Sequence, residues 1–343
     1  MKRFIKVLFF LIIIAGGAAY YVFNIIITPK VLADDTPTVF VHIPTGSTFE
    51  EVVNQLDSLQ LIPDRATFEL LAKQMNYYRD PMRAGRFGIK GGTMLHQMIQ
   101  LLRNGEQTAT KVILTTEREP MNIAAKAARF IETDSMSIVN LLQDNYFLDS
   151  IGYTKESLMS LFIPNTYEFY WNTDATGFIK RMVKEHKIFW DKNGRREKAA
   201  KMNLDLNEVY TLASIVEKET LRNDEKERMA GVYYNRIKKG MLLQADPTAV
   251  FATRDFNTTR VLNKHLNFDS PYNTYIYTGL PPGPITMSSI SSIDAVLNCE
   301  GHSYIFFCAK GDGSGYHNFA KTNAAHERNA AIYRRNLKKR GKR

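Results

Sequence analysis

Residues 212–220 read LASIVEKET, an apolar run that ends in two carboxylates, Glu217 and Glu219, with Lys218 between them. Apolar side chains at helical spacing predict a helix that begins near Asn207. They are Val209, Leu212, Ala213 and Val216. At about 100° per residue, Glu219 continues this inward stripe, whereas Glu217 turns toward solvent. We therefore expect a buried helix that ends in one inward-facing acid.

An inward-facing carboxyl loses hydration, and its pKa rises because burial disfavours the charged form. A general acid that works near neutral pH needs such a raised pKa. Glu219 is therefore the candidate catalytic residue. The alternative is structural: Glu217 and Lys218 would be surface charges, and Glu219 would cap the helix or pair locally.

Two segments downstream favour a ligand site. The first, YYNRIKKGMLLQADPTAVF from Tyr233 to Phe251, predicts an Asn-Arg pair on a helix and then an extended Leu-Gln-x-Asp-Pro-Thr segment. The second, SPYNTYIYTGLPPGPI from Ser270 to Ile285, predicts a loop. Aromatic faces with amide and hydroxyl groups suit a neutral sugar chain, and a loop packed by its own tyrosines is the alternative. The predicted substrate-binding residues are Asn235, Arg236, Gln244, Asp246, Thr248, Tyr272, Asn273 and Tyr275.

Other chemical motifs are weak, and we expect neither a metal nor a cofactor. Cys299 and Cys308 form no CxxC pair and have no histidine at zinc spacing, so a zinc site is not expected. Two buried free thiols are expected, and a disulfide between them is the alternative. The glycines of GDGSG, residues 311–315, have the spacing of a dinucleotide motif. They lie between two strand-like segments with no helix behind them, and they predict a hairpin turn.

Residues 1–30 predict a membrane anchor. Three basic residues precede an uncharged run from Val7 to Ile27, which is about 30 Å long as a helix. Small residues inside the run keep a cleaved signal peptide open as the alternative. By the positive-inside rule the N-terminus is cytoplasmic and everything after about Pro29 lies outside. We expect a single-pass protein of the inner, cytoplasmic membrane with an extracytoplasmic, periplasmic working domain.

Residues 36–107 predict a small β-α-α-β unit followed by a third helix. Its elements are TVFVHI, STFEEVVNQLDSLQ capped by Ser47 or Thr48, ATFELLAKQM, GRFGIK and TMLHQMIQLLRNG ended by Gly105. This order resembles a LysM-type glycan-binding module, and a small packing domain is the alternative.

Residues 108–335 predict the catalytic domain, and residues 336–343 a basic tail. ATKVILTT reads as a strand, NIAAKAARFI and KESLMSLF as helices, and TGFIKRMVKEHKIFWDK as an amphipathic helix. IPNTYEFYW carries an aromatic cluster with a Pro-Asn-Thr turn. The fold class is therefore α+β, with about two domains in 343 residues.

The net charge of +10 does not indicate nucleic-acid binding. The last ten residues hold seven Lys or Arg and no acid, so most of the excess lies in one short tail. No stripe of arginines and aromatic residues recurs in the body of the chain.

Four segments in order resemble the successive motifs of the MltG (YceG-like) endolytic murein transglycosylases. They are IVEKET, NR…GM.LQ.DPT, YNTY…GLPPGPI and YIFFCAKGDGSGYHNFAKTNAAH, and the likeness runs from the anchor to about Tyr333. The resemblance implies a catalytic domain similar to lysozyme-like lytic transglycosylases behind a LysM-like module. In that family the catalytic acid is the second glutamate of EKET, which is Glu219 here. Where the family often has Pro-Asp-Thr, this chain has Asn165, so it offers no carboxylate there.

The resemblance also implies a reaction. Glu219 would cut the MurNAc-GlcNAc β-1,4 bond of nascent strands as both acid and base, leaving 1,6-anhydroMurNAc ends and terminating strand elongation. Asp246 would orient or bind substrate rather than act as a second acid. The implied partners are glycan strands, the membrane and the penicillin-binding polymerases. A non-catalytic glycan-binding membrane tether is the alternative function.

Overall fold

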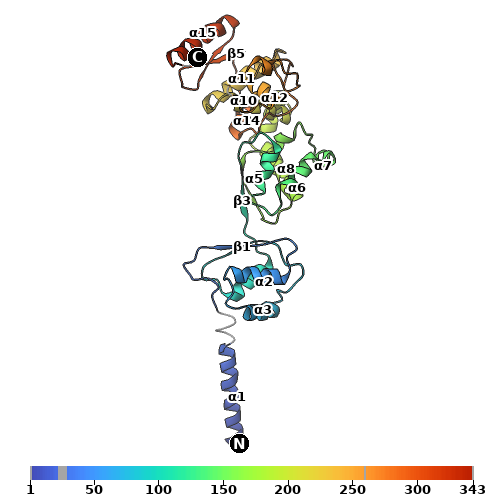
Figure 1. Cartoon of the computed structure of the whole chain (residues 1–343), viewed down its shortest axis with the longest axis vertical. Helices are drawn as coiled ribbons and strands as arrows, with labels where there is room; N and C mark the ends of the chain where they lie inside the picture. Colours follow the sequence, from blue (N-terminus) through green and yellow to red (C-terminus); the bar gives the residue numbers. More distant parts are fainter. Residues whose placement is uncertain (1, 22–28, 259, 342–343) are drawn as a thin grey trace. The chain divides into compact units, whose positions relative to one another are not determined.

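The protein is described by a computed structural model that covers residues 2–21, 29–258 and 260–341. The fold is mixed α+β, and within these residues three two-stranded sheets accompany the helices (Figure 1). The chain forms two compact units. The first comprises Met1–Val112, Phe130–Thr133 and Glu168–Asp174, and the second comprises Ile113–Arg129, Asp134–Tyr167 and Ala175–Arg343.

The first unit contains the β-α-α-β order and the third helix that the sequence predicts. Its elements are β1 (Val39–Ile43), α2 (Phe49–Ser58), α3 (Arg65–Gln74), β2 (Gly85–Ile89) and α4 (Leu95–Asn104). The two strands pair antiparallel, with Val41 opposite Phe87, and both of these side chains lie in the core of the unit. Gly105 ends α4 in a left-handed conformation at φ 74°, which glycine adopts without strain.

Helix α2 shows why the local sequence folds as predicted. The Thr48 side chain accepts a hydrogen bond from the Glu51 amide at 3.3 Å, and the Glu51 carboxylate accepts one from the Thr48 amide at 2.8 Å. This capping box satisfies donors that the helix start would otherwise leave unpaired. The stripe of Val52, Val53 and Leu56 is buried in the core of the first unit.

Helix α1 (Lys2–Tyr21) carries most of the predicted anchor. None of the helices in the described part of the chain has the combined length and hydropathy needed to cross a membrane. Residues 22–27, the last of the predicted apolar run, lie outside the described residues.

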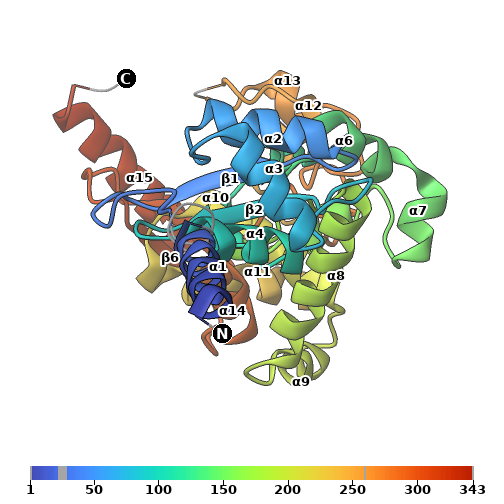
Figure 2. The same cartoon turned by 90° about the horizontal axis from the view of Figure 1, so that it is seen from below.

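The second unit is mainly helical. Strands β3 (Thr110–Leu114) and β4 (Asn165–Phe169) pair with each other, and each contains residues assigned to both units. The further elements are α5 (Pro120–Ala127), α6 (Ser135–Gln143), α7 (Asn145–Ser150), the 3₁₀ helix η2 (Leu158–Leu161), α8 (Ala175–Asp191), α9 (Arg195–Lys201), α10 (Leu206–Glu219), η3 (Asn223–Glu225), α11 (Lys226–Lys238), α12 (Asp246–Thr253), α13 (Asn263–Leu266), α14 (Ile290–Leu297), β5 (Phe306–Ala309), β6 (His317–Ala320) and α15 (Asn323–Lys339). Figure 2 shows α8 leading into α9 and α15 running out to the C-terminus.

Helix α10 forms the centre of this unit. It begins with a capping box between Asp205 and Glu208, and every residue from Val209 to Val216 is buried. Helices α11 and α14 pack against it. The helix ends at Glu219, because the following residue, Thr220, is extended. The predicted helix and its inward stripe are thus confirmed, and the core holds the end of α10 in place.

Three local predictions were wrong. KESLMSLF forms only the short 3₁₀ helix η2, in which Leu158, Met159 and Leu161 are all buried. Pro-Asn-Thr forms no turn, since Asn165 is already the first residue of β4. The Asp-Pro-Thr of LQADPT is not extended but starts α12, where Pro247 occupies the first turn that its fixed φ favours.

The C-terminal hairpin is as predicted. Strands β5 and β6 pair antiparallel with Phe307 opposite Phe319. The glycines at 311, 313 and 315 all have positive φ, which the tight turn between the strands requires. Much of the predicted basic tail is the last turn of α15, and residues 342 and 343 lie outside the described residues.

Candidate active site

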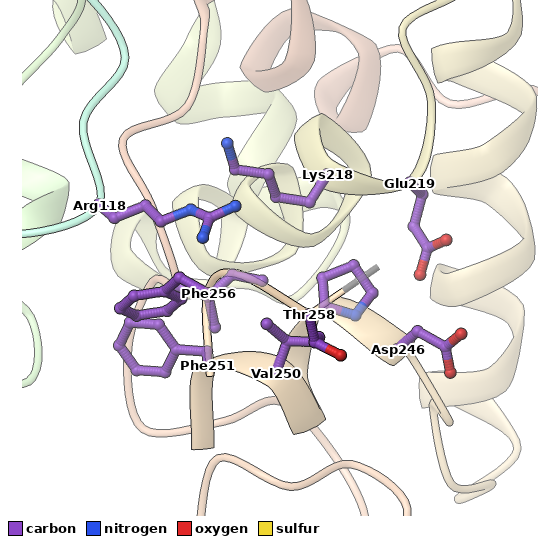
Figure 3. A pocket seen from close by; sticks show the side chains of 10 residues that line it. Arg118, Lys218, Glu219, Asp246, Val250, Phe251, Phe256 and Thr258 are labelled. Atoms are coloured by element: carbon purple, nitrogen blue, oxygen red, sulfur yellow. The ribbon is translucent and has the colours of Figure 1, made fainter. Parts of the chain in front are cut away.

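Glu219 lies at the C-terminal end of α10 and lines a pocket of about 250 Å³, the Glu219 pocket (Figure 3). The Tyr233 hydroxyl, from α11, donates a hydrogen bond to Glu219 Oε1 at 2.7 Å. Part of the Glu219 side chain remains accessible from the pocket, and the rest is packed into the protein. The carboxyl is therefore held by one partner and open to a ligand.

Burial raises the pKa of Glu219 to about 7. The charge of Asp246 contributes to this rise, whereas the hydrogen bond from Tyr233 and the charge of Arg236 act against it. Burial and the nearby Glu219 also raise the pKa of Tyr233 well above its usual value, so the phenol keeps its proton. Near neutral pH, Glu219 thus exists in both protonation states, as an acid-base catalyst requires.

The wall of the Glu219 pocket combines cations, a second carboxylate and apolar side chains. Its residues are Arg118, Lys218, Glu219, Asp246, Pro247, Val250, Phe251, Phe256, Thr258 and Ile285. Figure 3 shows the carboxyl groups of Glu219 and Asp246 on the same side of the pocket, and the rings of Phe251 and Phe256 on another. The Arg118 guanidinium stacks 4.8 Å from the Phe256 ring centre. The pocket can receive a ligand that has both polar and apolar surface.

A second hollow of about 620 Å³, the hairpin pocket, also has Glu219 in its wall. The residues after α10, the turn between β5 and β6, and α15 form it. Leu221 is 94% exposed beside it, and the Arg222 side chain donates to the Ser314 carbonyl and stacks on Tyr316. Because both hollows include Glu219, a long ligand can extend away from this carboxyl into two separate spaces.

Glu217 does not turn toward solvent, and this prediction was wrong. Its carboxylate accepts hydrogen bonds from the hydroxyls of Ser289 and Ser292 and pairs with Lys226 at 3.2 Å. Burial opposes its ionisation, but these hydrogen bonds and the Lys226 charge outweigh burial and lower the pKa of Glu217. Helical phase moves Glu217 off the inward stripe of α10, but it carries no information on α14, which covers this side chain.

Three of the predicted substrate-binding residues lie at or beside the Glu219 pocket. Asp246 lines the pocket, and its Oδ1 accepts a hydrogen bond from the Tyr275 hydroxyl. Tyr272 packs on Phe251 with ring centres 4.8 Å apart and lines a neighbouring hollow. The structure therefore brings these side chains toward Glu219 from the two downstream segments.

The other predicted binding residues mainly hold the backbone. Arg236 donates to the carbonyls of Ile305 and Leu243 at 2.7 Å each. The remaining contacts are from Asn235 to the carbonyls of His302 and Tyr304, from Thr248 to Ala245 and Thr274, and from Asn273 to the carbonyls of His265, Leu266 and Phe268. Gln244 is exposed, with φ 50°. None of these five residues lines the Glu219 pocket as the structure describes it.

Sequence reasoning missed Tyr233, Arg118 and Lys218. Tyr233 stands two residues before the Asn-Arg pair, so it lies inside a segment that the sequence had already singled out. Arg118 lies about a hundred residues upstream, in TTEREP just before α5, where no local pattern points to the site. Among the described residues, no group of three His, Cys, Asp or Glu side chains could hold a metal ion.

Known proteins resemble this chain along most of its length. The chain is 30% identical to the endolytic murein transglycosylase of Bacillus subtilis strain 168, with 92% of this chain and 90% of that protein covered. It is 25% identical to the endolytic murein transglycosylase of Streptococcus pneumoniae strain D39, of which it spans 63%, with 94% of this chain covered.

A solved structure gives the same fold. The crystal structure of a YceG-like protein from Listeria monocytogenes matches with a TM-score of 0.56 and 27% identity, covering 86% of this chain and 99% of that one. The model of the YceG-like family matches residues 41–332. Since that match spans most of the sequence, the chain belongs to the YceG-like family.

Proposed function

We propose that this protein is an endolytic murein transglycosylase. It cuts the β-1,4 bond between MurNAc and GlcNAc within peptidoglycan strands and leaves 1,6-anhydroMurNAc ends. The observation that carries the proposal is Glu219, a carboxyl whose pKa is about 7 and which lies in the walls of two hollows. The names of the Bacillus and Streptococcus relatives support the same activity.

Glu219 performs both proton transfers. In its protonated form it gives its proton to the oxygen that links MurNAc to GlcNAc, and that C–O bond breaks. The Glu219 carboxylate then takes the proton of the MurNAc C6 hydroxyl, whose oxygen closes onto C1. Tyr233 donates to Glu219 Oε1 and stabilises the carboxylate that forms between the two steps.

Asp246 is the one feature that favours a hydrolytic outcome instead. Glycoside hydrolases usually use a second carboxylate as nucleophile or to activate water. Asp246 lies in the Glu219 pocket, but its Oδ1 is held by the Tyr275 hydroxyl. We assign Asp246 to substrate orientation, so that Glu219 alone carries the chemistry.

The two hollows support cleavage within a strand. An enzyme that trims chain ends needs room on one side of the scissile bond only, whereas an endolytic enzyme needs room on both. The Glu219 pocket and the hairpin pocket supply such room, about 250 and 620 Å³ respectively. We propose that the strand crosses Glu219 from one into the other.

The first unit suggests where the enzyme works. We propose that it is a LysM-like module, supported by its β-α-α-β order and by a hollow of about 380 Å³ where the residues after β1, Pro44–Ser47, meet the start of α2. We also propose that the basic, then apolar, N-terminal sequence anchors the protein in the cytoplasmic membrane with the catalytic unit outside. At that place it would terminate strands as the penicillin-binding polymerases extend them.

Product analysis with the full-length protein tests the activity. Uncrosslinked glycan strands are incubated with the wild type and with Glu219→Gln, and the products are analysed by mass spectrometry. We expect shorter, anhydro-ended strands from the wild type and none from the variant. Glu197→Gln, an exposed carboxyl on α9, is the matched control and should cleave normally.

The products also separate the alternatives. Strands that remain intact with the wild type would identify a glycan-binding tether, and products with free reducing ends would identify a hydrolase. Full activity of Glu219→Gln would overturn the assignment of the acid.

A further inference from the structure

A third hollow of about 280 Å³, the side pocket, adjoins the Glu219 pocket. The two share Arg118 and Phe251 in their walls, so they form neighbouring parts of one surface depression. The side pocket is built from the start of α5, one face of α6 and the segment around η2. The proton transfers proposed for Glu219 do not use the side pocket.

The floor of the side pocket is aliphatic. Leu142, Leu158 and Met159 are at most 6% exposed, and Val139 and Met121 add to the same lining. Aromatic side chains occur where the side pocket approaches the Glu219 pocket, at Phe251 and Tyr272. A sugar chain usually finds flat aromatic faces and neutral polar groups in its site, and most of this floor offers neither.

The rim of the side pocket carries charges of both signs. Arg118, Lys155 and Arg254 supply cations, and Glu119 and Glu156 supply carboxylates. Arg254 and Glu119 form an ion pair of 3.0 Å whose side chains are about half exposed, so a charged ligand can replace either partner at little cost. The site therefore suits a ligand with small apolar groups and several charges.

Within a murein strand, only one part has this chemistry. The glycan itself is neutral, whereas the peptide stem on each MurNAc carries alanine methyl groups, free carboxylates and an amine. A stem leaves the sugar ring sideways, and a sugar in the Glu219 pocket has the side pocket next to it. We propose that the side pocket binds the peptide stem of the MurNAc at the cleavage site. This assignment rests on the proposed murein substrate.

The test compares two substrates with the full-length enzyme. One is an uncrosslinked strand with its stems, and the other is the same strand after an amidase has removed them. The ratio of kcat/KM for the two substrates isolates the contribution of the stem, because a general loss of activity cancels. We expect the wild type to prefer the strand with stems.

Two variants change the pocket without touching buried residues. Lys155→Glu reverses a rim charge, and Met121→Trp fills the space from an exposed position. Each should lower the kcat/KM ratio about fivefold, which corresponds to roughly 1 kcal/mol of stem binding. Lys180→Glu on α8 and Met136→Trp on α6 are matched exposed controls outside the pocket and should keep the wild-type ratio.

The proposal would be overturned if both variants kept the wild-type ratio of kcat/KM for the two substrates. It would also be overturned if the wild-type enzyme cleaved the strands with and without stems equally well. Binding of the isolated stem peptide to Glu219→Gln, followed by NMR, separates this proposal from the proposed activity. If the wild type cleaves neither strand but the peptide still shifts side-pocket resonances, the activity is wrong and the stem site stands. If cleavage occurs and the peptide shifts nothing there, only the stem site is wrong.

Discussion

We expect the pKa of Glu219, the proposed acid, to set the pH dependence of cleavage. A general acid is active when protonated, and the pKa of about 7 means that the protonated fraction falls as the pH rises through 7. We expect kcat/KM to fall about tenfold per pH unit above this value. Initial rates between pH 5 and 9 on a single strand preparation measure this. A rate that stays constant up to pH 9 would show that Glu219 is not the acid.

Tyr233 tunes the same carboxyl. Its hydrogen bond lowers the pKa of Glu219 against the larger effect of burial. Tyr233→Phe removes the donor, so the falling limb of the pH profile should move to higher pH while the maximal rate drops about tenfold. The neighbouring Tyr234→Phe is the control, since that hydroxyl donates to the Met202 carbonyl and should leave the profile in place. An unshifted limb in Tyr233→Phe would exclude this tuning role.

For single residues, helical phase was enough to predict that Glu219 faces inward, but not to predict the surroundings of Glu217. Phase depends on sequence spacing, so it correctly placed Glu219 on the inward side of α10. The environment of Glu217 depends on Ser289 and Ser292, about seventy residues downstream. No local pattern contains that information.

At the scale of elements, Glu217 ties the end of α10 to the starts of α11 and α14. Lys226 is only 6% exposed, and its ammonium also contacts the hydroxyls of Ser289 and Ser291. Glu217→Ala would leave this cation buried without its counter-ion, which should lower the free energy of unfolding by about 3 kcal/mol. Urea denaturation at pH 7 measures the loss. Glu227→Ala, an exposed change on α11, should cost less than about 0.5 kcal/mol.

The pH dependence of this loss checks its cause. Because the pKa of Glu217 is lowered on folding, its stabilisation is present above the unfolded pKa of about 4.5 and is lost as the pH falls through the lower folded value. The difference between wild type and Glu217→Ala should therefore shrink in acid. A difference that is equally large at pH 3 would indicate packing rather than charge.

Elements with a regular apolar stripe were predictable, and those without one were not. Helices α2 and α8 have one buried and one wet face, and α10 keeps a regular apolar stripe although its middle is buried on all sides. The sequence placed the ends of all three within about two residues. The segment of η2 is buried on all sides, and the start of α12 depends on a proline that reads equally well as a turn residue. Four residues are too few to show a helical period, and a proline that fits both a turn and a helix start leaves the choice to the tertiary fold.

At the scale of the whole molecule, the residues that line the candidate site come from distant parts of one unit. The Glu219 pocket draws on residue 118, on the end of α10, on α12 and on the loop at residue 285, all within the second unit. The sequence predicted the parts that lie in continuous motifs. It could not show that Arg118 joins them, because that contact depends on the tertiary fold.

The first unit also contains two segments that lie downstream of its helices in the sequence, residues 130–133 and 168–174. Glu132 accepts hydrogen bonds at 2.6 Å from the amide and the hydroxyl of Thr45, and His42 lies edge-on against Trp171 with ring centres 5.0 Å apart. A chain that begins at residue 108 would therefore lack Thr45 and His42, which contact these two segments. The compact unit is made of pieces that are discontinuous in sequence.

We accordingly expect the chain cut at residue 108 to unfold at a lower temperature than the full-length protein. Glu132→Ala in the full chain isolates the polar part of this effect and should cost about 1–2 kcal/mol, because it leaves the Thr45 amide without its acceptor. Circular dichroism melts of the three proteins measure both changes. Glu106→Ala, whose carboxylate pairs only locally with Asn104, is the exposed control. Equal melting temperatures for the cut and full-length chains would show that residues 130–133 and 168–174 hold their structure without the first unit.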